Sequence, residues 1–466
     1  MFFCFAICSS AKAGWSAGPL YDDFSLTLSS GHRTEIAGPL YFFEQNDSQR
    51  QWAVPPLFSY THDPDVEAEE FDFLYPLLTY DRFGSEYRFE ILQLFSFAGG
   101  QTQSEIQKKR FTLFPLYFQQ RSTDPNLNYT ALFPLYGTIK NRLFRDEIKF
   151  VLFPAYAKTR KKDVVTQNIL FPVFHWRQGE ALQGWQVWPL VGHEHKEPTH
   201  KTNSLDELVT IGGHDKWFGP WPIFFKDRTG IGTTNEQNQI SVLPLFTRLR
   251  SPNRDSATYL WPIGLTLTDE REKKYHEVGF PWPFFVVARG EGKTVTRFWP
   301  LFSRAHNQFL QSDFYLWPIY KFNRLHSEPL DRSRLRILFY LYSDTTEKNT
   351  QTGDFKRRLD LWPLFTARHD LNGNERLQIL APLEPIFPHN KSIERDYSPL
   401  WSIWRSEKNA KTGASSQSLL WNLYRREKTP DTKKCAVFFG LFQYESDARK
   451  KTFRSFSWPL FKQEKE

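Results

Sequence analysis

Histidine and acidic side chains crowd one stretch of the chain in a pattern that could bind a metal ion. Four of the twelve histidines fall within 22 residues, His193, His195, His200 and His214, and Glu194 and Asp215 lie next to them in the sequence. In an extended segment His193 and His195 point to the same side, and imidazole with carboxylate suits Zn²⁺, Ni²⁺ or Cu²⁺. The spacing matches no closed zinc site. We therefore expect a long polar loop at about residues 192–219 and leave metal binding by these histidines open.

No stretch of the sequence carries a known catalytic motif. The Gly230–Gly232 segment lacks the Lys-Ser/Thr that follows in a phosphate-binding loop. The sequence contains no Gly-x-Ser-x-Gly elbow, His-Glu-x-x-His or Cys-x-x-Cys. The densest acidic cluster, Glu67–Glu70, has almost no apolar residues to shift the pKa values of its carboxyls, so a solvated acidic turn is predicted. We expect no catalytic, cofactor or metal site, and a protein that is not an enzyme.

Composition excludes several classes of protein. The 44 Phe, 16 Trp and 19 Tyr among 466 residues provide too much apolar surface for a disordered chain. Cys4 and Cys8 lie near the N-terminus and leave only Cys435, which excludes a disulfide scaffold. No run approaches the ~18 apolar residues of a membrane-spanning helix. The 60 Lys and Arg are spread along the chain without a basic block, so nucleic acid is not expected as a partner.

The N-terminal segment has the features of an export signal. Residues 1–13 contain a short apolar core followed by Ala11-Lys12-Ala13, the small-x-small pattern of a signal-peptidase site. A basic start is missing from the segment. We predict a signal peptide over residues 1–13 and export from the cytoplasm, with a cytosolic protein as the alternative.

A four-residue motif recurs along the whole chain. It consists of Phe or Trp, then Pro, an aliphatic residue and usually an aromatic residue. Clear copies are Phe114–Tyr117, Phe133–Tyr136, Trp299–Phe302 and Trp362–Phe365. With looser copies there are about 23 units between Pro19 and Pro459, or one per ~20 residues. Such a period indicates a repeat architecture, so residues 14–466 are predicted to form a single β-repeat domain.

Each repeat is predicted to contain one β-strand and one reversal. Residues 257–267 are aromatic, aliphatic and Thr-rich, which suits a strand, and Ser251–Asp255 is a typical turn cluster between motifs. One turn per repeat predicts an all-β, antiparallel up-and-down meander of about 22 strands, each of roughly 10–14 residues with proline at mid-strand. The sequence offers no reason for a mid-strand proline. A β-solenoid or a multilayer β-repeat scaffold is the alternative.

Alternation along such strands predicts two faces that are both apolar at the centre. Trp317 and Ile319 would lie on one face, and Leu316, Pro318 and Tyr320 on the other. Both faces then need cover from lipid, from another layer or from a hydrophobic ligand. A sheet of about 22 strands exceeds the ~10 that usually stay open, so we expect closure into a large β-barrel.

The tandem Phe/Trp-Pro-Leu-Phe/Tyr units are similar to those of uncharacterised bacterial envelope proteins, a resemblance that implies no activity. The predicted architecture resembles outer-membrane β-barrels. That resemblance implies an outer-membrane location, contact with membrane lipid, and a structural or transport role for a lipidic or amphipathic molecule. The alternative is a soluble periplasmic or secreted β-repeat scaffold that binds a partner in the envelope.

Overall fold

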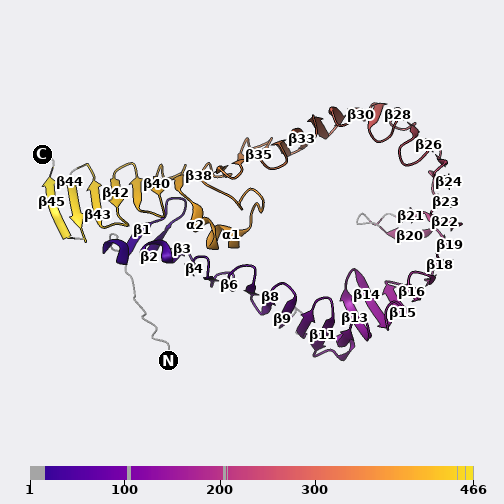
Figure 1. Cartoon of the computed structure of the whole chain (residues 1–466), viewed down its shortest axis with the longest axis horizontal. Helices are drawn as coiled ribbons and strands as arrows, with labels where there is room; N and C mark the ends of the chain where they lie inside the picture. The colour runs from indigo at the N-terminus through magenta and orange to yellow at the C-terminus, as the bar shows by residue number, and fades with distance from the viewer. Residues whose placement is uncertain are drawn as a thin grey trace. The chain divides into compact units, whose positions relative to one another are not determined.

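The computed structural model describes residues 16–101, 106–202, 206, 208–448, 450–456 and 458–464. The predicted signal peptide, residues 1–13, lies outside these residues. The described chain contains 45 β-strands, three 3-10 helices and two short α-helices (Figure 1). It divides into two compact units, unit 1 with residues 1–93 and 327–466, and unit 2 with residues 94–326. The prediction of an all-β antiparallel meander is confirmed in both units.

Unit 2 is a run of antiparallel strands from β9 to β33. The strands are β9 (Phe95–Gln101), β10 (Gln107–Leu113), β11 (Tyr117–Ser122), β12 (Tyr129–Leu132), β13 (Tyr136–Arg142), β14 (Arg145–Val151), β15 (Tyr156–Lys161), β16 (Val164–Ile169), β17 (Phe174–Gln178), β18 (Leu182–Val187), β19 (Val191–Lys196), β20 (Thr199–Thr202), β21 (Leu208–Ile211), β22 (Gly213–Phe218), β23 (Phe224–Ile231), β24 (Gln237–Val242), β25 (Phe246–Arg250), β26 (Arg254–Tyr259), β27 (Leu265–Glu270), β28 (Tyr275–Gly279), β29 (Phe285–Arg289), β30 (Lys293–Phe298), β31 (Phe302–Asn307), β32 (Leu310–Tyr315) and β33 (Tyr320–Ser327). The 3-10 helix η3 (Pro125–Leu127) precedes β12.

Unit 1 contains two ladders and the only α-helices of the described chain. The first ladder comprises β1 (Asp22–Ser25), β2 (Gly31–Ile36), β3 (Tyr41–Asn46), β4 (Gln49–Val54), β5 (Phe58–Asp63), β6 (Ala68–Phe73), β7 (Leu78–Phe83) and β8 (Glu86–Ile91), with η1 (Gly18–Leu20) and η2 (Gly38–Leu40). The second comprises β34 (Leu330–Ile337), β35 (Tyr342–Asn349), β36 (Phe355–Leu361), β37 (Phe365–His369), β38 (Glu375–Ile379), β39 (Trp404–Lys408), β40 (Ser415–Leu419), β41 (Tyr424–Lys428), β42 (Lys433–Val437), β43 (Phe442–Ser446), β44 (Lys450–Ser455) and β45 (Trp458–Glu464). Helices α1 (Lys391–Asp396) and α2 (Ser398–Trp401) lie between β38 and β39.

Strands pair with their neighbours in sequence, as an up-and-down meander requires. In β25 and β26, for example, Phe246 lies opposite Tyr259 and Thr247 opposite Thr258. The hairpin β20–β21 leaves this order, so β19 pairs with β22. Among the described residues no pairing joins the first strand to the last, and the expected closure into a barrel by hydrogen bonds is not found.

The proline motif lies in a turn, so the prediction of about 22 long strands with proline at mid-strand is wrong. Strand β26 ends at Tyr259 and β27 begins at Leu265, with the Trp261–Ile263 motif between them. Each repeat therefore forms two strands of 4 to 8 residues. The physical reason is that proline has no N–H to donate to a ladder, whereas a turn leaves that position unpaired.

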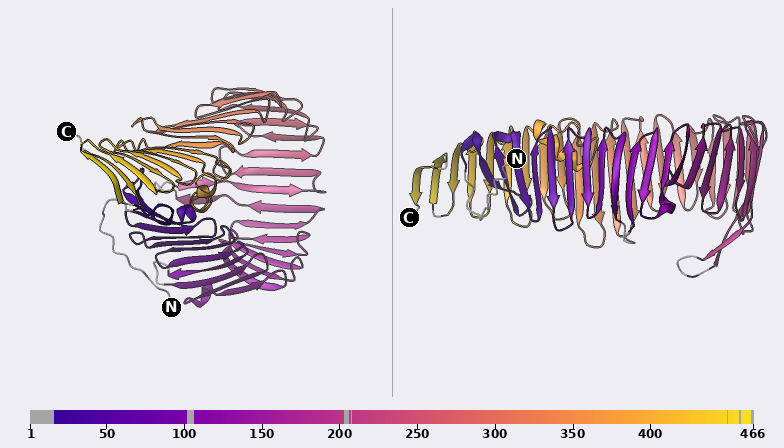
Figure 2. Two further views of the ribbon diagram at one scale, coloured as in Figure 1. Left: turned by 60° about the vertical axis from the view of Figure 1, so that its left-hand side comes forward. Right: turned by 90° about the horizontal axis from the view of Figure 1, so that it is seen from below.

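The turns define two rims in each unit, because successive reversals lie at opposite ends of the strands. The proline motifs occupy one end, which we call the proline rim. Clusters such as 251–253 and 290–292 occupy the other end, the charged rim. Figure 2 shows the strands side by side with reversals at both ends, and the β20–β21 hairpin extending beyond the strands.

The two faces of the sheet differ in chemistry. Tyr259, Leu265 and Leu267 lie on one face, the aromatic face, and Leu265 is the first residue of the strand that follows the proline turn. The cross-strand pair Thr258 and Thr266 lies on the other, the polar face, with 3.2 Å between the two hydroxyl oxygens. The prediction of two apolar faces is wrong for these strands, because the strands are shorter and their polar residues point to one side.

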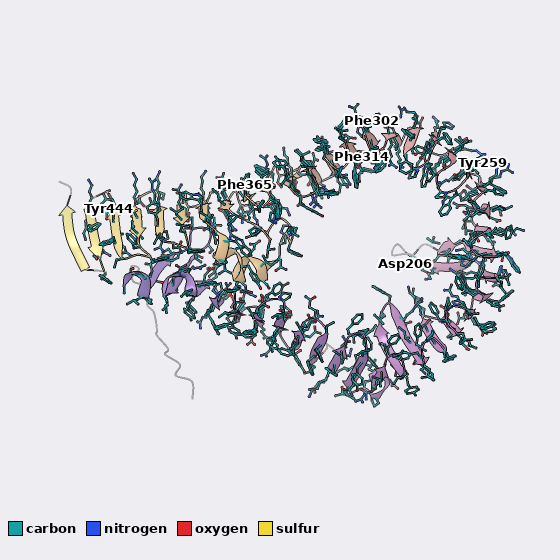
Figure 3. The ribbon with its side chains drawn as sticks, viewed as in Figure 1. Asp206, Tyr259, Phe302, Phe314, Phe365 and Tyr444 are labelled. Atoms are coloured by element: carbon teal, nitrogen blue, oxygen red, sulfur yellow. The ribbon has the colours of Figure 1, made fainter. Side chains whose placement is uncertain are left out.

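The polar face of unit 2 still carries two buried apolar clusters. One contains Phe118, Tyr129, Ala131, Ile139, Phe150 and Ala157, and the other contains Tyr275, Val286, Ala288 and Val295. Figure 3 shows Phe302 and Phe314 on opposite sides of the sheet. Ser303 lies opposite Phe314 in the ladder, so aromatic residues also occur on the polar face.

Candidate functional site

The polar faces of the two ladders in unit 1 meet through charged and amide side chains. Arg425 Nη1 of β41 lies 2.8 Å from Asp22 Oδ2 of β1. Asn422, in the turn before β41, donates a hydrogen bond of 2.8 Å from Nδ2 to Oε1 of Glu35 on β2. The two pairs join residues 403 and 387 positions apart. Charged and polar side chains therefore contribute to the connection between the N-terminal ladder and the C-terminal one.

Helix α1 adds a second connection through one arginine. Arg395 Nη1 donates to Thr61 Oγ1 and to Glu70 Oε2, each at 2.9 Å, and Nη2 contacts Asp72. The side chains of Arg395, Asp72 and Asp396 are at most 6% exposed. This cluster is therefore a buried charge network, in which each carboxylate depends on the guanidinium for compensation.

The cap of α1 explains how the short helix is held in place. Asn390 Oδ1 accepts a hydrogen bond of 3.0 Å from the Ile393 N–H, which satisfies one of the helix's free donors. Asn390 Nδ2 also donates to the Tyr75 hydroxyl at 3.0 Å, and the Tyr397 hydroxyl donates to the Tyr75 carbonyl at 2.6 Å. The helix is thus fixed to the turn between β6 and β7, and Arg395 is positioned by it.

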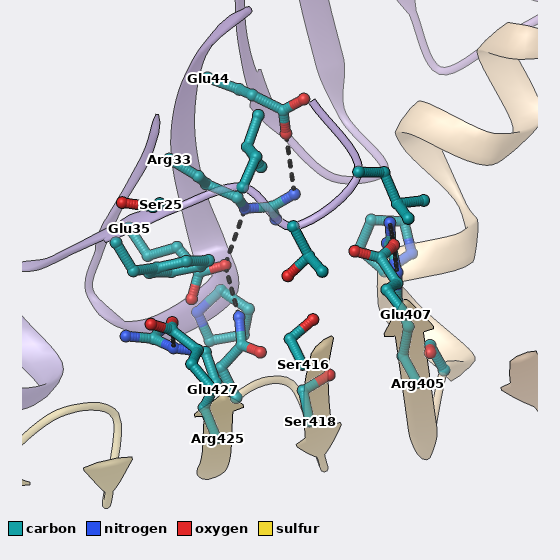
Figure 4. A pocket seen from close by; sticks show the side chains of 18 of the residues that line it. Ser25, Arg33, Glu35, Glu44, Arg405, Glu407, Ser416, Ser418, Arg425 and Glu427 are labelled. Atoms are coloured by element: carbon teal, nitrogen blue, oxygen red, sulfur yellow. Dashed lines mark hydrogen bonds and ion pairs between the residues drawn. The ribbon is translucent and has the colours of Figure 1, made fainter. Parts of the chain in front are cut away.

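A cavity of about 190 Å³ lies between the ladders, and three strands each place an arginine and a glutamate on it (Figure 4). In each strand the glutamate follows the arginine by two positions, so both side chains lie on the same face of the strand. The pairs are Arg33 with Glu35 at 2.9 Å, Arg405 Nε with Glu407 at 2.7 Å, and Arg425 Nε with Glu427 at 2.8 Å. Ser416, Ser418 and Glu44 complete this part of the wall.

Burial and charge act in opposite directions on these groups. Burial raises the pKa of the Glu407 carboxyl, but Arg405 and Arg376 outweigh it, so its pKa lies below the usual value. Burial lowers the pKa of the Arg405 and Arg425 guanidinium groups, but neighbouring carboxylates outweigh it and raise both pKa values. These side chains therefore hold opposite charges near pH 7 and are unsuited to proton transfer. The cavity can hydrogen-bond a polar group, and it is primarily an ionic core.

The structure separates the histidines that the sequence brought together. His193 and His195 lie on the same side, as predicted: His193 Nε2 is 2.5 Å and His195 Nδ1 3.7 Å from Asp215 Oδ1. The His193 ring also stacks on Trp217 at 3.9 Å between centroids. These contacts account for both imidazoles within the aromatic face. The segment predicted as a long loop contains β19, β22 and the β20–β21 hairpin instead.

The other two histidines point elsewhere. His214 Nε2 lies 2.7 Å from Glu194 Oε1 on the polar face, where Arg177 also binds Glu194 at 2.5 Å. His200 belongs to the separate hairpin, with Nδ1 3.1 Å from the Thr210 hydroxyl. Within the described residues, no group of three or more His, Cys, Asp or Glu side chains is placed to hold a metal ion.

Two groups of functional residues were missed by sequence reasoning. Glu70, predicted to belong to a solvated turn, binds Arg395, because α1 returns to this strand from more than 300 residues away. The arginine–glutamate pairs of the cavity could have been found from their local signal. Arg-x-Glu within a strand places both charges on one face, and Arg358 with Asp360 repeats the pattern at 2.8 Å.

The proline rim presents exposed apolar side chains in both units. In unit 2, Leu260 is 65%, Trp261 47% and Ile263 55% exposed within a single turn. Other rim residues with large exposed side chains are Leu20, Leu40, Leu57, Leu77, Leu116, Leu135, Leu190, Leu245, Leu301, Leu364 and Phe438. The apolar surface continues onto the aromatic face, where Tyr259 and Leu267 are also exposed. Exposed apolar side chains gathered along one rim are typical of surfaces that contact lipid or another protein.

Comparison with known proteins identifies no related family. No family model matches the chain, and no curated protein matches it either. In the part of the chain that the structure describes, none of the helices has the length and apolar character needed to cross a bilayer.

Proposed function

We propose that this protein is an envelope protein that inserts its proline rim into one leaflet of a membrane. The exposed apolar band carries the proposal. In this arrangement the rim and the adjoining part of the aromatic face contact lipid, while the charged rim stays in water. We expect a structural or transport role at the outer membrane, with a lipidic or amphipathic molecule as the ligand.

The depth of the band supports a single leaflet. On the aromatic face of β27, Leu265 and Leu267 are followed by Asp269, which begins the charged part of the strand. Four residues at ~3.4 Å each put Asp269 about 14 Å below Leu265. The turn with Trp261 and Ile263 extends the apolar surface slightly further. Half of a ~30 Å hydrocarbon core is about 15 Å, so the apolar part of β27 and its turn fits one leaflet.

A membrane-spanning β-barrel is the second candidate. The alternation of aromatic and polar faces favours it, because barrel strands place apolar residues toward lipid and polar residues inward. Crossing strands need about 9–11 residues, however, and those seen here have 4 to 8. Closure would also require contacts beyond the observed ladders. A soluble scaffold whose rim binds an envelope protein is the third candidate.

Flotation with lipid vesicles tests the proposal. The full chain, mixed with vesicles of phosphatidylethanolamine and phosphatidylglycerol, is expected to float with them through a density gradient and to resist carbonate. Three exposed rim residues of unit 2 are replaced together, as Leu135→Asp, Leu245→Asp and Leu301→Asp. Each loses roughly 1.5–3 kcal/mol of apolar burial, so partitioning should fall at least ~10-fold.

The charged rim offers a matched control. Phe144 and Phe309 are 95% and 53% exposed, against 45–58% for the substituted leucines, and they lie in turns at the opposite ends of the strands. Phe144→Asp with Phe309→Asp should float like the unmodified protein. An unmodified chain that stays with the soluble fraction would favour the scaffold. Equal losses in the two sets of variants would contradict insertion by the proline rim.

A further inference from the structure

The polar face of the second ladder in unit 1 carries an unusual row of arginines. Arg358 lies directly opposite Arg368, and Arg368 lies directly opposite Arg376, on three adjacent strands. On β34, Arg334 and Arg336 continue the same face. Like charges placed opposite each other across strands destabilise a sheet, so this row needs compensation from elsewhere.

One end of the row is compensated by acids. Glu394 of α1 binds Arg368 at 2.5 Å and lies 3.7 Å from Arg376. Glu407 lies 3.7 Å from Arg376 as well. Burial raises the pKa of the Glu394 carboxyl, but Arg368 and Arg376 outweigh it and lower the pKa. Helix α1 therefore neutralises the β37–β38 end of the row.

The β34–β36 end is not compensated in the same way. Arg358 has a partner in Asp360, with 2.8 Å between Nε and Oδ2. Among the described side chains no acid lies within ion-pair distance of Arg334 or Arg336, although Arg332 on the same strand pairs with Glu347 at 3.2 Å. The cationic surplus is thus confined to the region around β35.

Hydrogen-bond donors in this region also lack acceptors. The Nε atoms of Arg334 and Arg336 and the Nη1 atom of Arg358 are buried without a partner among the described atoms. Buried polar atoms are nearly always satisfied in folded proteins, so each exception needs an explanation, and a bound ion is one of them. Three unsatisfied guanidinium donors on one face point to an anion.

The pairing register brings these donors around one strand. Arg334 and Arg358 flank Thr345 from either side, and Arg336 flanks Ser343, two residues along the same strand. Strands are about 4.8 Å apart, so long arginine side chains on both sides of β35 can reach a common ligand. The Thr345 and Ser343 hydroxyls lie on the same face and can donate further hydrogen bonds.

Electrostatics agree with this geometry. Burial and the positive charge of the neighbouring Arg336 lower the pKa of the Arg334 guanidinium. Burial, Arg358 and Arg368 lower the pKa of His389, which lies in the loop before α1. Both groups experience a positive potential that an anion would relieve.

We propose that Arg334, Arg336 and Arg358 form a binding site for a phosphate-type oxyanion. A tetrahedral phosphate offers several charged oxygens, which guanidinium groups bind in bidentate fashion. A free phosphate or diphosphate and a phosphorylated lipid headgroup share this chemistry. The site does not depend on insertion of the proline rim, because the arginines lie on the polar face.

Pyrophosphate binding to the full chain tests the site. We expect saturable binding by isothermal titration calorimetry, and a rise in the melting temperature with pyrophosphate. The double variant Arg334→Gln with Arg336→Gln should bind at least ~10-fold more weakly. Its melting temperature without ligand should stay the same or rise, because two partly buried arginines without acidic partners are removed. A merely structural role would lower it.

Two further variants separate charge from geometry. Arg357→Gln is the matched control, because Arg357 lies on the aromatic face and pairs with Asp344. It should bind pyrophosphate normally. Arg334→Lys keeps the charge but loses the planar fork, and it should weaken binding in a protein with an unchanged net charge.

Vesicles identify the source of the phosphate. Binding to phosphatidic acid vesicles that is stronger than binding to phosphatidylcholine vesicles, with the difference lost in the double variant, would assign a lipid headgroup. Pyrophosphate binding alone would assign a soluble ligand. Either result supports the oxyanion site. Absence of binding in both arms, binding that does not depend on Arg334 and Arg336, or a lower melting temperature of the ligand-free double variant would overturn it.

Discussion

The buried arginine of α1 provides the sharpest test of how unit 1 is held together. Arg395→Met keeps a long side chain but removes the guanidinium from Glu70, Asp72 and Asp396. Asp72 and Asp396 are then buried without a compensating charge. Breaking a buried ion pair in this way costs about 3–5 kcal/mol. We expect the free energy of unfolding to fall by that amount at pH 8.

The penalty should depend on pH. Uncompensated buried carboxylates bind protons more readily than exposed ones, so acid relieves the charge that Arg395→Met leaves behind. The unfolding free energy of the variant, relative to the unmodified protein, should therefore recover between pH 8 and pH 5. Urea unfolding followed by circular dichroism measures the difference, and hydrogen exchange in β5 and β6 locates it.

An exposed arginine serves as the control. Arg357 binds Asp344 in a bidentate pair, but its side chain is 49% exposed. Exposed pairs contribute about 0–1 kcal/mol, so Arg357→Met should change the unfolding free energy little. If Arg395→Met costs no more than Arg357→Met, or if its penalty does not grow with pH, the network around α1 does not stabilise the contact between the ladders.

Three other substitutions in unit 1 have defined expectations. Burial raises the pKa of Asp396 to about 6, so the folded state holds this proton more tightly than the unfolded state does. The stability of the unmodified protein therefore falls as pH rises through that value. Asp396→Asn should gain stability relative to the unmodified protein between pH 4 and pH 6, as measured by urea midpoints. Glu407→Gln leaves Arg405 without its ion-pair partner and should cost about 1–3 kcal/mol at pH 7. The loss should be smaller in acid, once the unmodified carboxyl is protonated too, and this requires a lower pH than for an ordinary glutamate because its pKa is lowered. Gly440→Ala should lower the melting temperature, because Gly440 has φ +82° and an added Cβ would lie 2.5 Å from Asp22 Oδ1.

Much of the fold could be predicted from the sequence, but the position of the turns was predicted wrongly. The 20-residue period and the β-forming composition correctly predicted an antiparallel meander. Aromatic and aliphatic residues favour strands, so composition alone places segments such as Trp261–Ile263 in strand interiors. They form tight reversals instead, without the Gly or Asn that marks the turns of the charged rim. A proline between two apolar residues was the available signal, since it removes a ladder donor.

The candidate site was harder to predict from the sequence, because its contacts join residues that lie far apart along the chain. Nothing local connects Arg425 with Asp22, or Arg395 with Asp72. The shared direction of His193 and His195 was predictable, because it depends only on alternation along a strand. A period-2 search for Arg-x-Glu would also have found the paired charges that line the cavity.

Depth measurements on the bound protein test the membrane proposal most directly. With the native cysteines replaced by serine, single spin labels are attached at Ile263→Cys on the proline rim, Leu267→Cys on the aromatic face and Asn253→Cys on the charged rim. Accessibility to oxygen and to a water-soluble nickel complex gives the depth of each label in vesicles. We predict the deepest position at 263, an intermediate one at 267 and an aqueous one at 253. Equal exposure to water at all three positions would contradict insertion of the rim.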